Sequence, residues 1–419
     1  MTYSIDTAAL RRLRGARFGA VTPTVYALGI TSLLTDVASE MVTAVLPLYF
    51  MVALQLSPLQ MGLLDAVYQG AAAVARLAGG WMADRWQRPK RVAGVGYGLS
   101  CACKLGWVAA GSSWPALSAV MAADRVGKGI RTSPRDAMIA GATDPRHVGL
   151  AFGVHRAFDS AGALAGPLVA FAILAAMPQG FDVVFVVSFF IALAGVAALV
   201  LLVPEPKAVP VSPQAVPVSP PSRPTFAQAL GLLREQRLRR VLVAVAALGV
   251  ATVADPFFYL LLQRSAALPV AWFPLLFLGT ALAYLAFAIP AGRLADRIGR
   301  GKVILLGYAL LLAACLALLG ASQHRAWGAL ALVLLGAYYA CTDGVLMAAV
   351  SAWLPQPLRA SGFAIVTTTT GLSRLAGSVL FGVVWSTWGL PIAVAVFAAA
   401  LAVAIIATAR TWVGLERMA

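Results

Sequence analysis

The sequence is poor in charged residues and has few histidines. Only 11% of its 419 residues are charged, while 61% are hydrophobic, and there are three histidines. A soluble domain of this composition would lack the polar surface that it needs to face water. The scarcity of charge therefore excludes an ordinary soluble protein and indicates that most of the chain lies in lipid.

Cysteine is equally scarce, and no nucleotide-binding loop is present. Cys101 and Cys103 are two residues apart, with no second pair or histidine near them in the sequence; Cys315 and Cys341 stand alone. This spacing disfavours a zinc site, and we expect all four as small buried side chains. The pattern G-x-x-x-x-G-K-[ST] is absent, so ATP is not expected to drive the protein. We therefore expect neither a metal nor a cofactor.

Long apolar runs fill most of the chain. A helix needs about 20 mainly apolar residues to cross a bilayer. On this basis we expect an all-α membrane protein with twelve transmembrane helices. The predicted spans are 22–52, 58–80, 92–111, 114–140, 148–173, 182–203, 241–263, 270–292, 303–321, 327–352, 360–386 and 388–410.

Basic residues outnumber acidic residues two to one, 32 against 16. With the N-terminus inside, the basic residues gather in cytoplasmic loops, and only Arg264 and Arg325 fall in the opposite loops. This asymmetry predicts cytoplasmic termini in a multi-pass protein of a bacterial inner membrane. Because the basic residues are scattered over short loops, we expect contact with anionic lipids and not with nucleic acid.

A proline-rich tract divides the chain into two parts. Residues 204–240 contain AVPVSP twice, which is typical of an extended linker, and end in FAQALGLLREQRLRR, which predicts a short surface helix. The expected organisation is a cytoplasmic tail without a signal peptide, a six-helix bundle, this linker, a second six-helix bundle and a short cytoplasmic tail. Their bounds are 1–21, 22–203, 204–240, 241–410 and 411–419.

The two parts share a short repeat. GGWMADRWQRPK follows the second span, and AGRLADRIGRGK follows the eighth. A sequence repeated at one place in two six-span halves indicates a transporter built from repeats, in which the glycine permits close helix contact. The matching residues are Gly80, Asp84, Arg85 and Arg88 in the first copy and Gly292, Asp296, Arg297 and Arg300 in the second.

This pattern, G-x-x-x-D-R-x-G-R-x-K, resembles that of the major facilitator superfamily, although Gln87 replaces a glycine in the first copy. The resemblance implies two pseudo-symmetric six-helix bundles, a monomer and secondary transport by alternating access. It also implies that the repeated residues form a cytoplasmic gate, with Asp136 as a partner of the first copy. The alternative is that the first copy only anchors its loop among lipid headgroups.

The fourth predicted span carries a stripe of charge. Asp124, Lys128, Arg131 and Arg135 lie at i, i+4, i+7 and i+11, which is one face of a helix. Each deep charge costs roughly 2.5–3.5 kcal/mol when it faces lipid. The stripe must therefore face a hydrated cavity or opposite charges. A closed set of structural ion pairs, such as Asp124 with Lys128, is the alternative.

Other deep charges fall on spans that line the central cavity in the resembled fold. Lys104, on an outer span, is an exception that we interpret as snorkelling or paired. We expect a polar cavity that binds a small-molecule substrate and protons. Its further members are Asp36 and Glu40 on span one, Arg156 and Asp159 on span five, Asp255 on span seven, Asp343 on span ten and Arg374 on span eleven, while Asp65 lies on span two.

Carboxylates in such a cavity can take up protons, and a moving neighbour changes their proton affinity. We expect Asp36 as the first proton carrier, with Glu40 and Asp124 as alternatives. RVGKG resembles the R-x-x-x-G pattern of proton-coupled drug exporters, which places Arg125 at the functional arginine. The resemblance implies that Arg125 tunes the proton affinity of these acids.

The sequence GALAGP on span five resembles the G-x-x-x-G-P motif of facilitator-family antiporters through Gly162, Gly166 and Pro167. The family's next glycine pair is absent, and a plain packing motif is the alternative. We expect proton-coupled efflux of a small organic compound such as a siderophore, a secreted metabolite or a drug. Proton-coupled uptake is the alternative.

An embedded enzyme is a more distant alternative. His155 and Asp159 have the H-x-x-x-D spacing of some acyltransferases, but the motif stands alone, without a second catalytic cluster. We therefore expect a transporter and not an enzyme.

Overall fold

The computed structural model describes residues 21–68, 70–71, 88–144, 147–205, 231–321, 324–351, 354 and 359–414. Within these residues all regular structure is helical, which confirms the predicted fold class. The first half contains α2 (Pro23–Leu48), its continuation in a wider π turn η2 (Tyr49–Ala53), a helical segment over residues 58–68, α4 (Pro89–Ala110), α5 (Trp114–Gly141), α6 (Val148–Ala176) and α7 (Phe181–Leu202).

The second half is built in the same way. It contains η3 (Leu232–Arg234), α9 (Gln236–Val250), α10 (Asp255–Ser265), η4 (Val270–Trp272), α11 (Phe273–Ile298), α12 (Arg300–Gly320), α13 (Arg325–Ser351), α14 (Arg359–Trp388) and α15 (Leu390–Gly414). Each predicted span therefore has a helical counterpart, the second over its described residues only. Nine helical stretches of the described chain are long and apolar enough to cross a membrane; α5, with its six ionisable side chains, and α14 are not among them.

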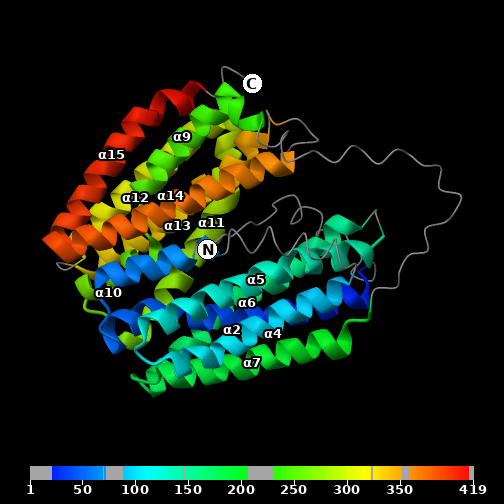
Figure 1. The fold of residues 1–419 in the computed structure, drawn as a ribbon. Coiled ribbons are helices and arrows are strands. Elements are labelled where there is room, and N and C mark those ends of the chain that lie inside the picture. The colour runs from blue at the N-terminus through cyan, green and yellow to red at the C-terminus, as the bar shows by residue number, and fades with distance from the viewer. Residues whose placement is uncertain are drawn as a thin grey trace, which may run out of the picture.

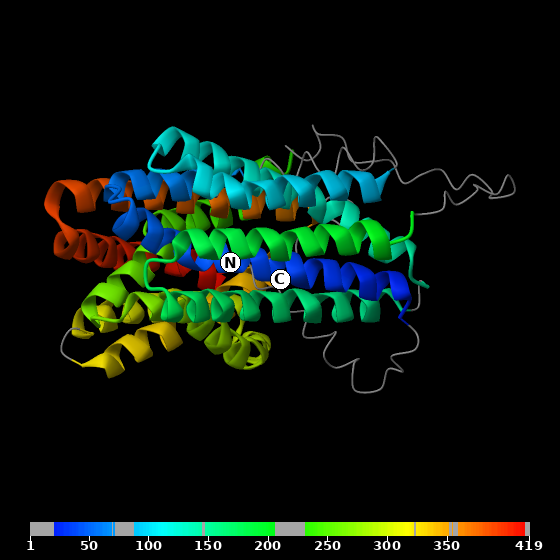
Figure 2. The same ribbon diagram turned by 90° about the horizontal axis from the view of Figure 1, so that it is seen from below.

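The two halves repeat the same packing. In the first, α2 packs on α6 and α7, and α4 packs on α5 and α7; in the second, α9 packs on α14 and α15, and α12 packs on α13 and α15. Figure 1 shows these halves as two groups of long helices, and Figure 2 shows the helices running roughly along one direction. Equivalent pairs in two bundles are the arrangement expected of a duplicated transporter.

The halves meet at one end of the molecule, which we call the closed end and which carries residues 54–57 and 266–272 (Figure 1). There the segment 58–68 lies directly against α14. A Cβ atom added to Gly62 would lie 2.6 Å from the carbonyl oxygen of Ser378, and one added to Gly382 would lie 2.6 Å from that of Pro58. The two glycines thus allow backbone to touch backbone across the halves.

Glycine packing also fixes α6 against α2. A Cβ atom at Gly162 would lie 2.6 Å from the carbonyl oxygen of Leu33, and one at Gly166 would lie 2.7 Å from that of Val37. The motif on span five therefore brings two helices into contact. Gly292 behaves differently, because an added Cβ would meet no described atom within 4 Å. The expectation that Gly292 permits close helix contact is wrong for this structure.

The structure differs from the sequence prediction around span seven. The span is broken at residues 251–254, and α10 begins at Asp255, followed by Pro256. The expected surface helix is also different where it is described, because residues 236–240 form the first turns of α9. All four cysteines are buried and unbridged, as predicted.

Candidate functional site

The charged face of α5 is placed by a close crossing with α4. A Cβ atom at Gly96 would lie 2.7 Å from the carbonyl oxygen of Gly127, and one at Gly127 would lie 2.8 Å from that of Gly96. The two backbones therefore touch, and the polar side chains one turn away are forced together. Ser100 and Lys104 of α4 meet Asp124 of α5 at this point.

Asp124 is the centre of a closed, buried network. It accepts hydrogen bonds from Ser100 at 2.6 Å and from Lys104 Nζ at 3.0 Å, and it also pairs with Arg125. Asp124 is 2% exposed and Lys104 is fully buried. The Arg125 guanidinium lies 4.4 Å from the ring centroid of Tyr68. Asp124 therefore pairs across α4 and α5, and its partner is not Lys128.

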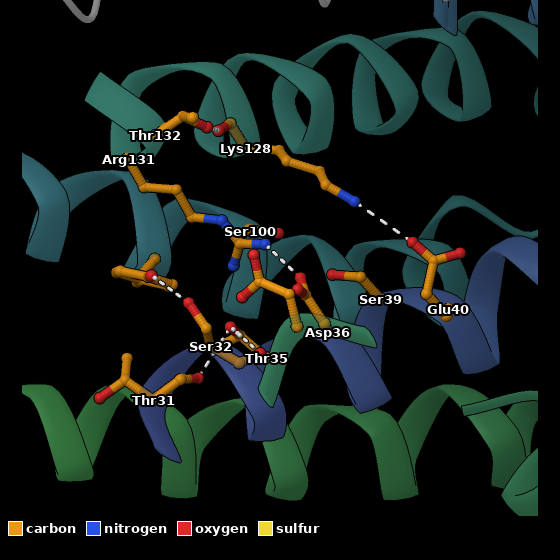
Figure 3. Close-up of polar contacts among 12 residues, drawn as sticks. Thr31, Ser32, Thr35, Asp36, Ser39, Glu40, Ser100, Lys128, Arg131 and Thr132 are labelled. Atoms are coloured by element: carbon orange, nitrogen blue, oxygen red, sulfur yellow. Dashed lines mark hydrogen bonds and ion pairs between the residues drawn. The ribbon is translucent and has the colours of Figure 1, made fainter. Parts of the chain in front are cut away.

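The next charges of α5 face the acids of α2 (Figure 3). Lys128 Nζ lies 3.2 Å from Glu40 Oε1, and Arg131 Nη2 lies 3.0 Å from Asp36 Oδ1. The two acids are four residues apart on α2, and the two bases are three residues apart on α5, so both pairs form side by side. The structure thus pairs Asp36 with Arg131, whereas Arg125 belongs to the Asp124 network.

The Lys128–Glu40 and Arg131–Asp36 ion pairs differ in their access to solvent. The Lys128 side chain is 35% exposed, while that of Arg131 is 3% exposed and stacks on the Tyr97 ring at 4.6 Å. The Oε2 atom of Glu40 is buried and has no hydrogen-bond partner among the described residues. The Lys128–Glu40 pair is therefore the more exposed of the two, and its acid keeps one oxygen without a partner in the described part of the chain.

The far end of the stripe involves α6. Arg135 pairs with Asp136 at 2.9 Å on its own helix and lies 3.8 Å from Asp159. Asp159 also lies 3.3 Å from His155 Nε2 and 3.7 Å from Arg156, whose side chain is 47% exposed. The His155 side chain is only 1% exposed. This burial disfavours the acyltransferase interpretation, because a catalytic histidine must meet its substrate.

The second half contributes fewer charges and more tyrosine. Asp255 begins α10 at the break in span seven and accepts a hydrogen bond from Tyr339. Arg374 of α14 donates to the Tyr338 hydroxyl at 3.1 Å and lies 5.6 Å from the Tyr339 ring centroid. Asp343 of α13 interacts electrostatically with Arg374. The predicted acids and arginine of this half therefore lie in one group.

Gly80, Asp84 and Arg85, predicted in the first copy of the gate, lie outside the described residues. Of the others, Arg88 is exposed and directly precedes α4. In the second copy, Asp296 and Arg297 are exposed at the end of α11, and Arg300 donates to the carbonyl oxygen of Ala348 at 2.8 Å, which links α12 to α13.

Sequence reasoning missed several partners of these charges. Lys104, interpreted from the sequence as snorkelling or paired, is paired with Asp124. Ser100 was missed, and its position four residues before Lys104, on the same face of α4, is the signal for it. Tyr68, Tyr97 and Tyr339 give no comparable signal, because an isolated tyrosine in an apolar span reads as ordinary packing.

Comparison with known proteins agrees with this architecture. The sequence profile described as Major Facilitator Superfamily matches residues 28–279 and 256–417. The chain belongs to the Major Facilitator Superfamily. It is therefore a secondary transporter and a multi-pass membrane protein, not an enzyme, and it handles a small-molecule substrate.

Relatives of this transporter are spread over distant organisms. An "Uncharacterized MFS-type transporter" of Methanocaldococcus jannaschii is 26% identical over 373 residues, covering 86% of this chain and 88% of the relative. An uncharacterized protein of Mycobacterium tuberculosis is 26% identical over 375 residues, covering 88% and 89%.

Among solved structures, the nucleoside transporter NupG has a TM-score of 0.76 at 15% identity, covering 93% of this chain and 98% of that chain. A POT family transporter in complex with a thioalcohol conjugated peptide has a TM-score of 0.74 at 13% identity, covering 95% and 99%. At these identities, the likeness demonstrates the shared fold.

Proposed function

We propose that this transporter exports a small organic compound with a cationic and an acidic group across a bacterial inner membrane, in exchange for protons. The single observation that carries the proposal is the Lys128–Glu40 pair. It joins a partly exposed cation to an acid with one oxygen that has no partner among the described residues, and the Asp36–Arg131 pair lies beside it.

The two ion pairs between α2 and α5 suggest how substrate could be exchanged for protons. A cationic group of the substrate can take the place of Lys128 beside the ionised Glu40, and an acidic group of the same substrate can then pair with the released Lys128 ammonium group. A proton on Glu40 removes the negative charge that the cationic group needs. Substrate and proton would thereby compete for Glu40, which is the requirement for antiport. We propose Glu40 and the neighbouring Asp36 as the proton carriers.

One feature favours export: the glycine motif that resembles that of antiporters packs α6 on α2, the helix that carries both acids. From the distribution of basic residues we also propose that the closed end lies on the outer side of the membrane. Proton-coupled uptake remains the alternative, and it predicts the opposite sign of coupling.

The test is transport in proteoliposomes that contain a pH-sensitive dye. A panel of small organic acids and zwitterions is added outside, and the movement of protons is followed as each compound moves. Antiport predicts that compound and protons cross in opposite directions; movement in the same direction would establish symport and refute export.

Two variants test the proposed carriers. Asp36→Asn and Glu40→Gln should each leave the protein folded and uncouple compound flux from proton flux. Thr43→Ala is the matched control on α2, because in the described part of the chain the Thr43 hydroxyl bonds to the backbone of its own helix at Ser39. Full proton-driven transport by both carboxamide variants would remove these two acids from the mechanism.

A further inference from the structure

A second group of acids lies between the halves at the glycine crossing of the closed end. Asp65 belongs to the segment 58–68 of the first half and lies one turn after Gly62, on the same face of the helix. It is 6% exposed, and its Oδ2 atom is buried without a hydrogen-bond partner among the described residues. An ionised carboxylate in this position would carry a buried oxygen without a partner among the described residues, which is costly in free energy.

Within the described residues, the charged groups that interact with Asp65 come from the second half. Asp65 interacts electrostatically with Asp255 of α10 and with Arg374 of α14. Asp343 of α13 also interacts with Asp255 and Arg374, and its Oδ2 atom is likewise buried and unpaired among the described residues. Among the described residues, three acids therefore share one base.

The hydrogen bonds within this group show which acid is already satisfied. Asp255 accepts the hydroxyl proton of Tyr339, which stabilises its anion beside the cation of Arg374. Asp65 and Asp343 each keep a buried oxygen that meets no hydrogen-bond partner among the described residues, although Ser378 lies close enough to Asp65 to interact with it. Within the described part of the chain, three ionised carboxylates face one guanidinium, and this excess of buried negative charge fits at least one bound proton.

Asp65 differs from Asp343 because it lies across the interface from the rest of the group. Asp255, Asp343 and Arg374 belong to the second half, and Asp65 belongs to the first. Separation of Gly62 from Ser378 would therefore carry Asp65 away from its neighbours and admit water to its carboxyl group. Separation of the two halves and ionisation of Asp65 would then be coupled.

We propose that Asp65 is a proton-binding site of the gate at the closed end, protonated while the halves meet around it and ionised when they separate. The proposal rests on proton-driven transport, and it adds a carrier to the pairs along α5. A single proton bound to the closed state alone makes the closed state more populated at low pH.

The segment 58–68 also connects this site to the charge network of the first half. Tyr68, three residues after Asp65, stacks against the guanidinium of Arg125. A movement of the segment at the gate therefore also moves the aromatic ring against which Arg125 is held.

The experiment measures the distance between spin labels across the closed end as a function of pH. Val52→Cys on the first half and Thr387→Cys on α14 are exposed positions, and the four native cysteines are buried. The wild-type background should open as pH rises, with the ratio of open to closed increasing by up to about tenfold per pH unit for one linked proton.

Substitution of Asp65 then decides the assignment. Asp65→Asn, which mimics the protonated acid, should stay closed at every pH, whereas Asp65→Glu should restore a pH-dependent distance. Asp36→Asn is the control, because it should uncouple transport and leave the gate responsive to pH. An Asp65→Asn protein whose distance still follows pH as in the wild-type background would overturn the proposal.

The failures of the two proposals are distinguishable. A distance that never responds to pH, together with proton-driven transport in proteoliposomes, would reject the gate site and retain the proposed function. A pH-responsive gate without proton-driven transport would reject the proposed function and retain proton binding at the gate.

Discussion

Removal of Asp124 should destabilise the first half far more than removal of its partner Lys104. Asp124 is the acid of a group that also contains two buried cations, Lys104 and Arg125. Asp124→Asn leaves both cations without the negative charge that compensates them. Loss of one partner of a buried pair costs roughly 3–5 kcal/mol, because the remaining charge is uncompensated.

Lys104→Met has the opposite consequence. It keeps most of the apolar stem of the lysine and leaves one acid, Asp124, paired with one base, Arg125. The substitution conserves volume in a packed position, so we expect a cost below about 1.5 kcal/mol. The double variant Asp124→Asn/Lys104→Met should fall between the single variants, because it leaves one uncompensated cation instead of two.

Thermal unfolding of the purified variants in detergent measures this difference. At about 2–4 °C per kcal/mol for a unit of this size, Asp124→Asn should lower the Tm by roughly 6–20 °C. Lys104→Met should lower it by a few degrees at most. Equal losses for the two variants, or a larger loss for Lys104→Met, would refute the charge count and with it a structural role for Asp124.

Three further predictions concern packing, transport and the linker. Gly166→Val should lower the yield of monodisperse protein, because the added Cβ atom would lie 2.7 Å from the carbonyl oxygen of Val37. Gly292→Ala is the control that should be tolerated, and equal yields of the two variants would contradict this account. Arg125→Ala should abolish transport in proteoliposomes while the protein still inserts in membranes, and retained transport would make this arginine dispensable. Deletion of residues 208–222 should leave the Tm unchanged, and a loss of folding would show that the tract does more than connect the halves.

The sequence alone predicts the helices well, because the membrane imposes their length and composition. The structure has α5 at Trp114–Gly141, where the prediction was 114–140. The structure breaks span seven before Asp255, where the apolar content alone predicts one continuous helix. Hydropathy measures how apolar a segment is and does not show whether its backbone is regular.

The site is less accessible to such reasoning. The spacing of Asp124, Lys128 and Arg131 predicts one charged face, and the structure agrees. It does not predict partners, because these depend on how closely neighbouring helices approach. The contact at Gly127 turns Asp124 toward Lys104 and leaves Lys128 and Arg131 to the acids of α2, and no feature of the α5 sequence reveals that division.

Each ion pair described for α5 lies within α5 or joins it to α2, α4 or α6. All of these pairs lie within the first bundle, so they can stay intact when the two bundles tilt relative to each other during alternating access. Resistance to that step then resides in the steric fit where Gly62 and Gly382 press on the opposing backbone. Such a transporter could change its substrate through substitutions around Tyr338 and Tyr339 of the second bundle, while the ion pairs of the first bundle stay unchanged.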